Sequence, residues 1–165
     1  MTPGIVFSSH NQWFPMSCTA SGMEMILKLH DKVDVGWFGF QQEYQNQNIG
    51  FSKISDLASF GIQATDHQSD LDTFLKTLDS QSDMGLYLLF SIPTVAYQKT
   101  FDHSYLGLGD YHIFVAGREQ NRNFYRSKRF LSSADIELPD IHLTWELCRT
   151  ARPDYLIHWV TYKLK

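Results

Sequence analysis

The stretch Gln12-Trp13-Phe14-Pro15-Met16-Ser17-Cys18-Thr19-Ala20 leads directly into Met23-Glu24-Met25-Ile26-Leu27-Lys28. The second run predicts a helix that begins near Cys18, with Ser17 as a suitable N-cap. A helix N-terminus carries free N–H groups and a partial positive charge, which favour a thiolate over a thiol. The amide of Gln12, six residues earlier, could fold back over the same place and donate to an oxyanion. The stretch therefore predicts half of a cysteine acyl-transfer site.

A candidate base lies far along the chain, in Leu106-Gly107-Leu108-Gly109-Asp110-Tyr111-His112-Ile113-Phe114-Val115-Ala116-Gly117. Glycines followed by an apolar, β-rich run predict a loop that enters a buried strand, and His112 opens that strand. Its ring could face a cleft while the rest of the strand joins the core. A Cys and a His that are distant in sequence and joined by the fold are typical of a nucleophile–base pair.

These motifs resemble those of papain-like cysteine proteases, and more narrowly of the C39-like peptidases that remove double-glycine leader peptides from bacteriocins. Gln12, Cys18 and Met25-Ile26-Leu27-Lys28 match the start of such domains in order and spacing, and His112 matches their His strand. The resemblance covers roughly residues 10 to 147. It implies an α+β papain-like fold with helices packed on an antiparallel sheet and the nucleophile at a helix N-terminus. It also implies a peptide or protein substrate and selectivity for small residues.

The family carries an Asp after the His strand to orient the imidazole, and this chain departs from that pattern. Antiparallel pairing about the turn 119–122 brings Ser127 or Lys128 to the expected place. A Ser hydroxyl can accept a hydrogen bond from the imidazole, but it cannot stabilise imidazolium as an anion does. Asn123 or Asp135 would replace it only in a different register. The expected catalytic residues are Cys18, His112, Gln12 and Ser127.

Three functions are compatible with these residues. The first is a cysteine peptidase, or a related thiol hydrolase of amide bonds, and the joint presence of Gln12, Cys18 and His112 favours it. The second is an acyltransferase or deamidase that uses the same pair with a different acceptor. The third is a catalytically impaired peptide-binding module, which the missing carboxylate motivates.

Length and composition predict one domain spanning residues 1–165. With 43% hydrophobic residues the chain can bury one sizeable core. A net charge of −4 does not suggest a nucleic-acid partner, and the basic residues between 118 and 129 are interpreted as a solvated hairpin face. No apolar stretch reaches the length of a membrane span.

The cysteines and the absence of known binding motifs bear on the compartment of the protein and on its use of metals or cofactors. Cys18 and Cys148 cannot form a disulfide framework, and Cys148 is interpreted as structural. Without a signal-like segment, we expect a cytoplasmic protein or one secreted without a classical signal peptide. The chain has neither an HExxH nor a CxxC spacing and no glycine-rich phosphate loop, so no metal or cofactor is predicted.

The expected elements are helices early in the chain and strands mostly later. Beyond the helix at Cys18, helices are predicted at 52–60 and 70–78, and strands at 61–65, 86–92, 111–116, 123–130 and 155–163. This order is typical of an α+β domain with an antiparallel sheet. In the first helix, Glu24 and Lys28 are expected to pair on the outer face. Ser69 and Asp72 are expected to form a capping box before the helix at 70–78.

Overall fold

A computed structural model describes the chain except for residues 1, 46, 95–110 and 129–134. The helices, among them the 3₁₀ helix η1, are α1 (Pro3–Ser9), α2 (Cys18–Leu29), α3 (Gly39–Glu43), η1 (Ile54–Phe60), α4 (Leu71–Asp83) and α6 (Ile141–Ala151). The strands are β1 (Ile62–Ser69), β2 (Leu88–Pro93), β3 (Tyr111–Glu119), β4 (Arg122–Lys128), β5 (Asp135–Glu137) and β6 (Ile157–Leu164).

The described strands form one sheet in the order β1-β6-β2-β3-β4-β5, and every neighbouring pair is antiparallel. The most apolar strands, β2 and β3, lie at its centre, where both faces are covered. The sheet and its helices confirm the predicted α+β class.

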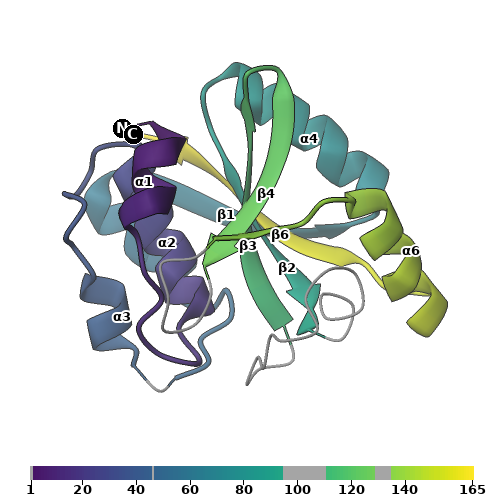
Figure 1. Ribbon diagram of the computed structural model, residues 1–165, viewed down its shortest axis with the longest axis horizontal. Coiled ribbons are helices and arrows are strands. Elements are labelled where there is room, and N and C mark those ends of the chain that lie inside the picture. The colour runs from purple at the N-terminus through teal and green to yellow at the C-terminus, as the bar shows by residue number, and fades with distance from the viewer. Residues whose placement is uncertain (1, 46, 95–110, 129–134) are drawn as a thin grey trace.

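Side chains that alternate along β3 supply two separate cores. Ile113 and Val115 join the core beneath α1, α2, α3 and η1, whereas Phe114 and Ala116 join the core beneath α4 and α6. Period-two alternation along a strand sends neighbouring residues to opposite faces of the sheet. Figure 1 shows the two groups of helices on either side of the strands. The sheet is therefore the middle layer of the molecule.

Helix α2 is buried on nearly all sides, which corrects the expected outer face. Both Glu24 and Lys28 are 0% exposed. The helix packs on β3 with one side, and α1 and α3 cover the other. A surface pattern of i,i+4 charges was therefore misread, because two further helices close over it.

Two local expectations also change. Helix α4 is capped by Asp70, whose carboxylate accepts the N–H of Thr73 at 2.9 Å, so the capping box of Ser69 and Asp72 is wrong. The Ser69 hydroxyl instead donates to the Asp70 carbonyl and accepts the indole N–H of Trp159. The segment 54–60 is a 3₁₀ helix, and the short strand β5 was not expected.

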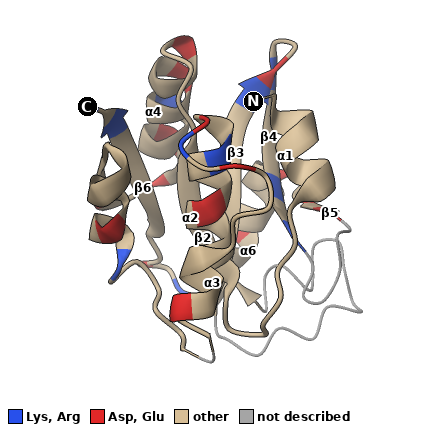
Figure 2. Cartoon of the chain, turned by 90° about the vertical axis from the view of Figure 1, so that its left-hand side faces the viewer, with Lys and Arg blue, Asp and Glu red and all other residues tan. Residues whose placement is uncertain are grey.

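Charged residues are interspersed along the chain. Figure 2, which views the molecule from the side of α1, shows acidic and basic positions on several elements rather than on one patch. Among the described helices, none combines the length and the apolar character needed to cross a membrane.

Candidate functional site

Cys18 is the first residue of α2 and borders a cavity of about 640 Å³. Ser17 occupies the N-cap position without accepting a capping hydrogen bond, and the backbone N–H groups of Cys18 and Thr19 are directed to the Cys18 sulfur instead. Burial raises the pKa of the Cys18 thiol, and hydrogen bonds to the sulfur from the backbone N–H of Ile113 and from Thr19 offset part of that rise. The resting group is therefore a neutral thiol, although the helix N-terminus alone favours a thiolate.

The backbone N–H that faces the Cys18 sulfur is that of Ile113, and it lies beyond the last described pair between β3 and β4. The described pairing of β3 with β4 runs from Val115↔Arg126 to Glu119↔Arg122, so Ile113 lies beyond the end of that ladder. On its other side, Ile113 is paired with Ser91 of β2. The N-terminus of α2 thus meets β3 where β4 has separated, and the peptide unit that Cys18 contacts is the one that follows His112.

The imidazole of His112 lies on the opposite face of β3 from the α2 core. It packs edge-on against Phe114, with ring centroids 5.2 Å apart, and its Nε2 atom is 2.7 Å from the hydroxyl of Ser127. Burial lowers the pKa of His112 to about 3, so the ring is neutral. Within the described residues, no hydrogen bond joins the imidazole to the Cys18 thiol. The two groups flank one peptide unit of β3 without touching directly.

Of the four residues considered as the orienter of His112, Ser127 occupies the position that the hairpin register predicts, whereas the ammonium of Lys128 donates to Asp135. Asn123 lies at the far end of β4, where its side-chain oxygen faces Arg118. Asp135 accepts from the Lys128 ammonium at 2.5 Å. Neither the Asn123 carboxamide nor the Asp135 carboxylate therefore replaces the Ser127 hydroxyl as the partner of His112.

Gln12 is buried, but its amide does not point at the thiol as an oxyanion donor would. Its Nε2 atom donates to the carbonyl of Phe14 at 3.1 Å, and its Oε1 atom has no hydrogen-bond partner in the described part of the chain. A buried amide with an unsatisfied oxygen is costly. The side chain therefore has reason to reorient when a donor or a ligand arrives.

The backbone on both sides of Gln12 is held by one residue of α3 that the sequence did not single out. The Oε1 atom of Gln41 accepts the N–H of Trp13 at 2.8 Å, and its Nε2 atom donates to the carbonyl of Asn11 at 2.9 Å. Glu24 in turn accepts from both the backbone and the side chain of Gln41. Because the amide of Gln41 is itself fixed, the segment that carries Gln12 is fixed as well.

A buried network of charged side chains surrounds Gln41 and Glu24. Lys28 donates to Nδ1 of His10 and to the carbonyl of Val35, and the Nε2 atom of His10 lies 3.0 Å from the Ser21 hydroxyl. Burial raises the pKa of Glu24 to about 7 and lowers the pKa of Lys28 to about 8. Burial, with the positive charge of Lys28 beside it, lowers the pKa of His10 to about 2. The network therefore contains a neutral histidine between a cation and an acid of weakened charge.

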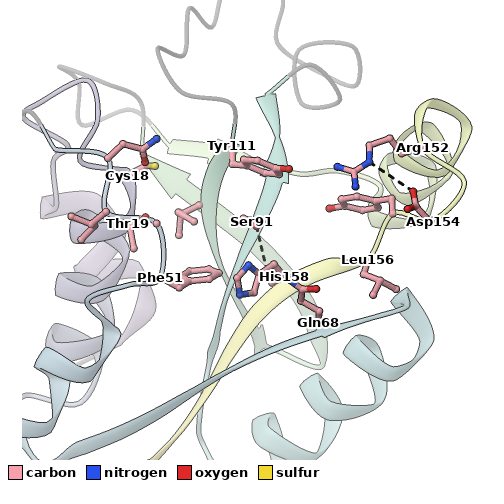
Figure 3. Close-up of a pocket in the computed structure, with 15 residues that line it drawn as sticks. Cys18, Thr19, Phe51, Gln68, Ser91, Tyr111, Arg152, Asp154, Leu156 and His158 are labelled. Carbon is pink, nitrogen blue, oxygen red and sulfur yellow. Dashed lines mark hydrogen bonds and ion pairs between the residues drawn. The ribbon is translucent and has the colours of Figure 1, made fainter.

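The cavity beside Cys18 is floored by the sheet, and Figure 3 shows the thiol on one side and Arg152 on the other. Side chains at adjacent register positions form the floor: Gln68, His158, Ser91 and Ile113. The Nε2 atom of His158 is 3.1 Å from the carboxylate of Asp66, which does not line the cavity, so His158 has the carboxylate partner that His112 lacks. In the sequence, 92 positions separate these two residues, and no local pattern announces their contact.

Comparison of the chain with protein-family models, with curated proteins and with solved structures finds no match. Among the described residues, no group of three or more His, Cys, Asp or Glu side chains is arranged to hold a metal ion.

Proposed function

We propose that this protein is a cysteine hydrolase of amide bonds, built on a papain-like arrangement, with Cys18 as nucleophile and His112 as base. One observation carries the proposal: the Cys18 sulfur faces the N–H of Ile113, the residue that follows His112 in β3, at the wall of a 640 Å³ cavity. The bond between His112 and Ser127 supports it further, because a base needs a partner that fixes its ring.

The first half of the reaction follows from these positions. The sulfur of Cys18 attacks the carbonyl carbon of the scissile amide, and its proton passes to the imidazole of His112, which must first turn from the opposite face of β3 toward the sulfur. The new C–S bond displaces an electron pair onto the carbonyl oxygen, which the backbone N–H of Cys18 and the reoriented amide of Gln12 stabilise. His112 then returns the proton to the departing nitrogen as the C–N bond breaks.

Water completes the cycle. It attacks the thioester carbon while His112 takes one of its protons, and collapse of the second tetrahedral adduct breaks the C–S bond, with His112 returning the proton to the sulfur, so that a carboxylic acid and the Cys18 thiol are released. Because both groups are neutral at rest, the proton must move during attack rather than beforehand. We therefore expect a slower enzyme than one whose pair rests as thiolate and imidazolium.

Alkylation by iodoacetamide across pH tests this proposal. All variants carry Cys148→Ser, so that Cys18 is the one thiol whose alkylation is measured. Wild-type Cys18 should react faster than the His112→Gln variant, and hydrolysis of a fluorogenic peptide library should vanish in Cys18→Ala. Equal alkylation with and without His112, together with no hydrolysis, would exclude the hydrolase.

A second candidate is a peptide-binding module without covalent chemistry. The raised pKa of Cys18 and the missing thiol–imidazole hydrogen bond favour it. In that case the cavity should bind peptides equally well in wild type and in Cys18→Ala, with no turnover in either.

A further inference from the structure

The side chain of Gln41 bridges the peptide groups on both sides of Gln12, and it is 0% exposed. Its Oε1 atom accepts the N–H of Trp13 at 2.8 Å, and its Nε2 atom donates to the carbonyl of Asn11 at 2.9 Å. An amide suits this place because it offers an acceptor at one end and a donor at the other. An ionised carboxylate lacks the donor, and an apolar side chain lacks both.

Glu24 fixes the amide of Gln41 in turn. The Oε1 atom of Glu24 accepts from Nε2 of Gln41 at 2.7 Å, and its Oε2 atom accepts from the backbone N–H of Gln41 at 2.9 Å. The ionised carboxylate accepts at both oxygens, whereas protonation turns one of them into a hydroxyl, which is a donor and a weaker acceptor. One of the two bonds must then weaken. The position of Gln41 therefore depends on the charge of Glu24.

The groups packed around Glu24 leave its charge responsive to pH near neutrality. Helix α2 presents Lys28, the segment after α1 presents His10, whose Nε2 atom is 3.7 Å from the carboxylate, and α3 presents the backbone of Phe40. Burial raises the pKa of Glu24 to about 7, whereas His10, with a pKa of about 2, stays neutral. Lys28, with a pKa of about 8, is mostly protonated up to pH 7.5. Between pH 5.5 and 7.5, Glu24 is therefore the group among these that changes charge most.

We propose that Gln41 is a positioning residue for the oxyanion donor Gln12, and that the ionised carboxylate of Glu24 keeps it in that role. The inference rests on the proposed function. Because the backbone is held on both sides of Gln12, its amide leaves the carbonyl of Phe14 by rotation of its own side chain alone. When Gln41 is released, the backbone moves as well, and the donor spends less time at the oxyanion.

A double-mutant cycle of Gln12→Ala and Gln41→Met tests the positioning role, with kcat for the fluorogenic peptide that wild type cleaves fastest as the readout. Loss of an oxyanion donor costs about a hundredfold in kcat. We expect Gln41→Met to lower kcat by about tenfold in wild type and to leave it unchanged in Gln12→Ala, where nothing remains to be positioned. Gln42→Met, a change at an exposed position of the same helix, should have no effect. Alkylation of Cys18 forms no oxyanion, so an equal rate in all these proteins would show that the fold is intact.

The role of the charge is tested by Glu24→Gln, which keeps an acceptor but cannot ionise. At pH 7.5, kcat of wild type should exceed that of Glu24→Gln by about fivefold, the worth of one hydrogen bond. At pH 5.5 the two should be equal, because Glu24 is then protonated in wild type. Exchange of the Trp13 amide hydrogen, followed by NMR at one pH, reports the same contact without catalysis. Its protection should fall by about fivefold in Gln41→Met.

Losses that multiply in the double variant, or a Trp13 exchange rate that Gln41→Met leaves unchanged, would overturn the positioning role of Gln41. A ratio of wild type to Glu24→Gln that is the same at both pH values would overturn the role of the charge. Hydrolysis by wild type separates this inference from the proposed function. If wild type cleaves peptides and the losses multiply, the positioning role fails alone. If wild type cleaves none, the hydrolase fails and the positioning role fails with it.

Discussion

The Nε2 atom of His112 lies 2.7 Å from the hydroxyl of Ser127, and both side chains are buried on the same face of the sheet. A hydroxyl holds the ring in place but supplies no negative charge. No negative charge offsets the cost of burying a protonated ring, so the pKa of His112 falls to about 3. The same relationship explains why the imidazole is neutral at rest, whereas the thiol is neutral because of its own burial.

Replacing this hydroxyl with a carboxylate should activate the site. In Ser127→Asp, an anion beside the ring raises the pKa of His112 and stabilises imidazolium once the thiol proton arrives. We expect alkylation of Cys18 by iodoacetamide at pH 7 to accelerate by about tenfold, which is one pKa unit of stabilisation. Ser127→Ala is the matched control and should not accelerate the reaction. An unchanged rate in Ser127→Asp would mean that His112 does not act on Cys18.

The buried network should dominate the stability of α2. Lys28→Met removes the donor to His10 and the charge beside Glu24, and breaking a buried charged set typically costs about 3–5 kcal/mol. Lys76→Met removes the cation of an i,i+4 pair with Asp72, in which the side chains are 78% and 75% exposed. Urea unfolding should show a large loss for the first variant and almost none for the second. Similar losses would contradict a structural role for the network.

The hairpin of β3 and β4 has a glycine that its packing requires. A Cβ atom at Gly117 would lie 2.5 Å from the ring of Tyr87 and 2.8 Å from the ring of Phe124. We expect Gly117→Ala to cost about 1–3 kcal/mol, as overpacking of a core does. Gly4→Ala in α1, where a Cβ would meet nothing within 4 Å, should stabilise the protein slightly through helix propensity. Thermal melting of both variants measures this difference in stability. A melting temperature that is unchanged by Gly117→Ala would contradict the requirement for glycine at this position.

Local signals in the sequence were enough to predict the elements that carry the site. The apolar run after His112 predicts β3, and the turn at 119–122 predicts the register that puts Ser127 beside His112. Helix α2 begins at Cys18, where the sequence places it. Each of these predictions rests on periodicity or on contacts between neighbouring elements, which a sequence pattern can express.

Contacts between distant segments could not be predicted in this way. Glu24 and Lys28 have the spacing of an exposed pair, and only the packing of α1 and α3 over α2 buries them. Gln41 lies in an amide-rich stretch that gives no sign of its two bonds around Gln12. Long-range strand pairing of β1 with β6 likewise creates the contact between Asp66 and His158.

Stability should fall on acidification, with a slope that steepens below pH 4.5. His10 and His112, with pKa values of about 2 and about 3 instead of 6.5, stay neutral in the folded state while the unfolded chain binds their protons, so stability is lost as pH falls below 6.5. Glu24 acts in the opposite direction. Its pKa of about 7 instead of 4.5 means that the folded state binds the extra proton between these values, and its contribution decreases as pH rises through them.

The net difference between unfolded and folded chains from these three groups is one proton between pH 6.5 and 4.5, and two below pH 4.5. The free energy of unfolding should therefore fall by about 1.4 kcal/mol per pH unit at first and by about 2.7 kcal/mol per unit afterwards. Urea unfolding of wild type and His112→Gln at pH 7, 5.5 and 4 isolates one histidine, whose removal should halve the steeper slope. His142→Gln, a change at an exposed histidine of α6, should leave the slope as it is. Parallel curves for wild type and His112→Gln would show that the imidazole is not held neutral by burial, and the account of the resting pair would fail with it.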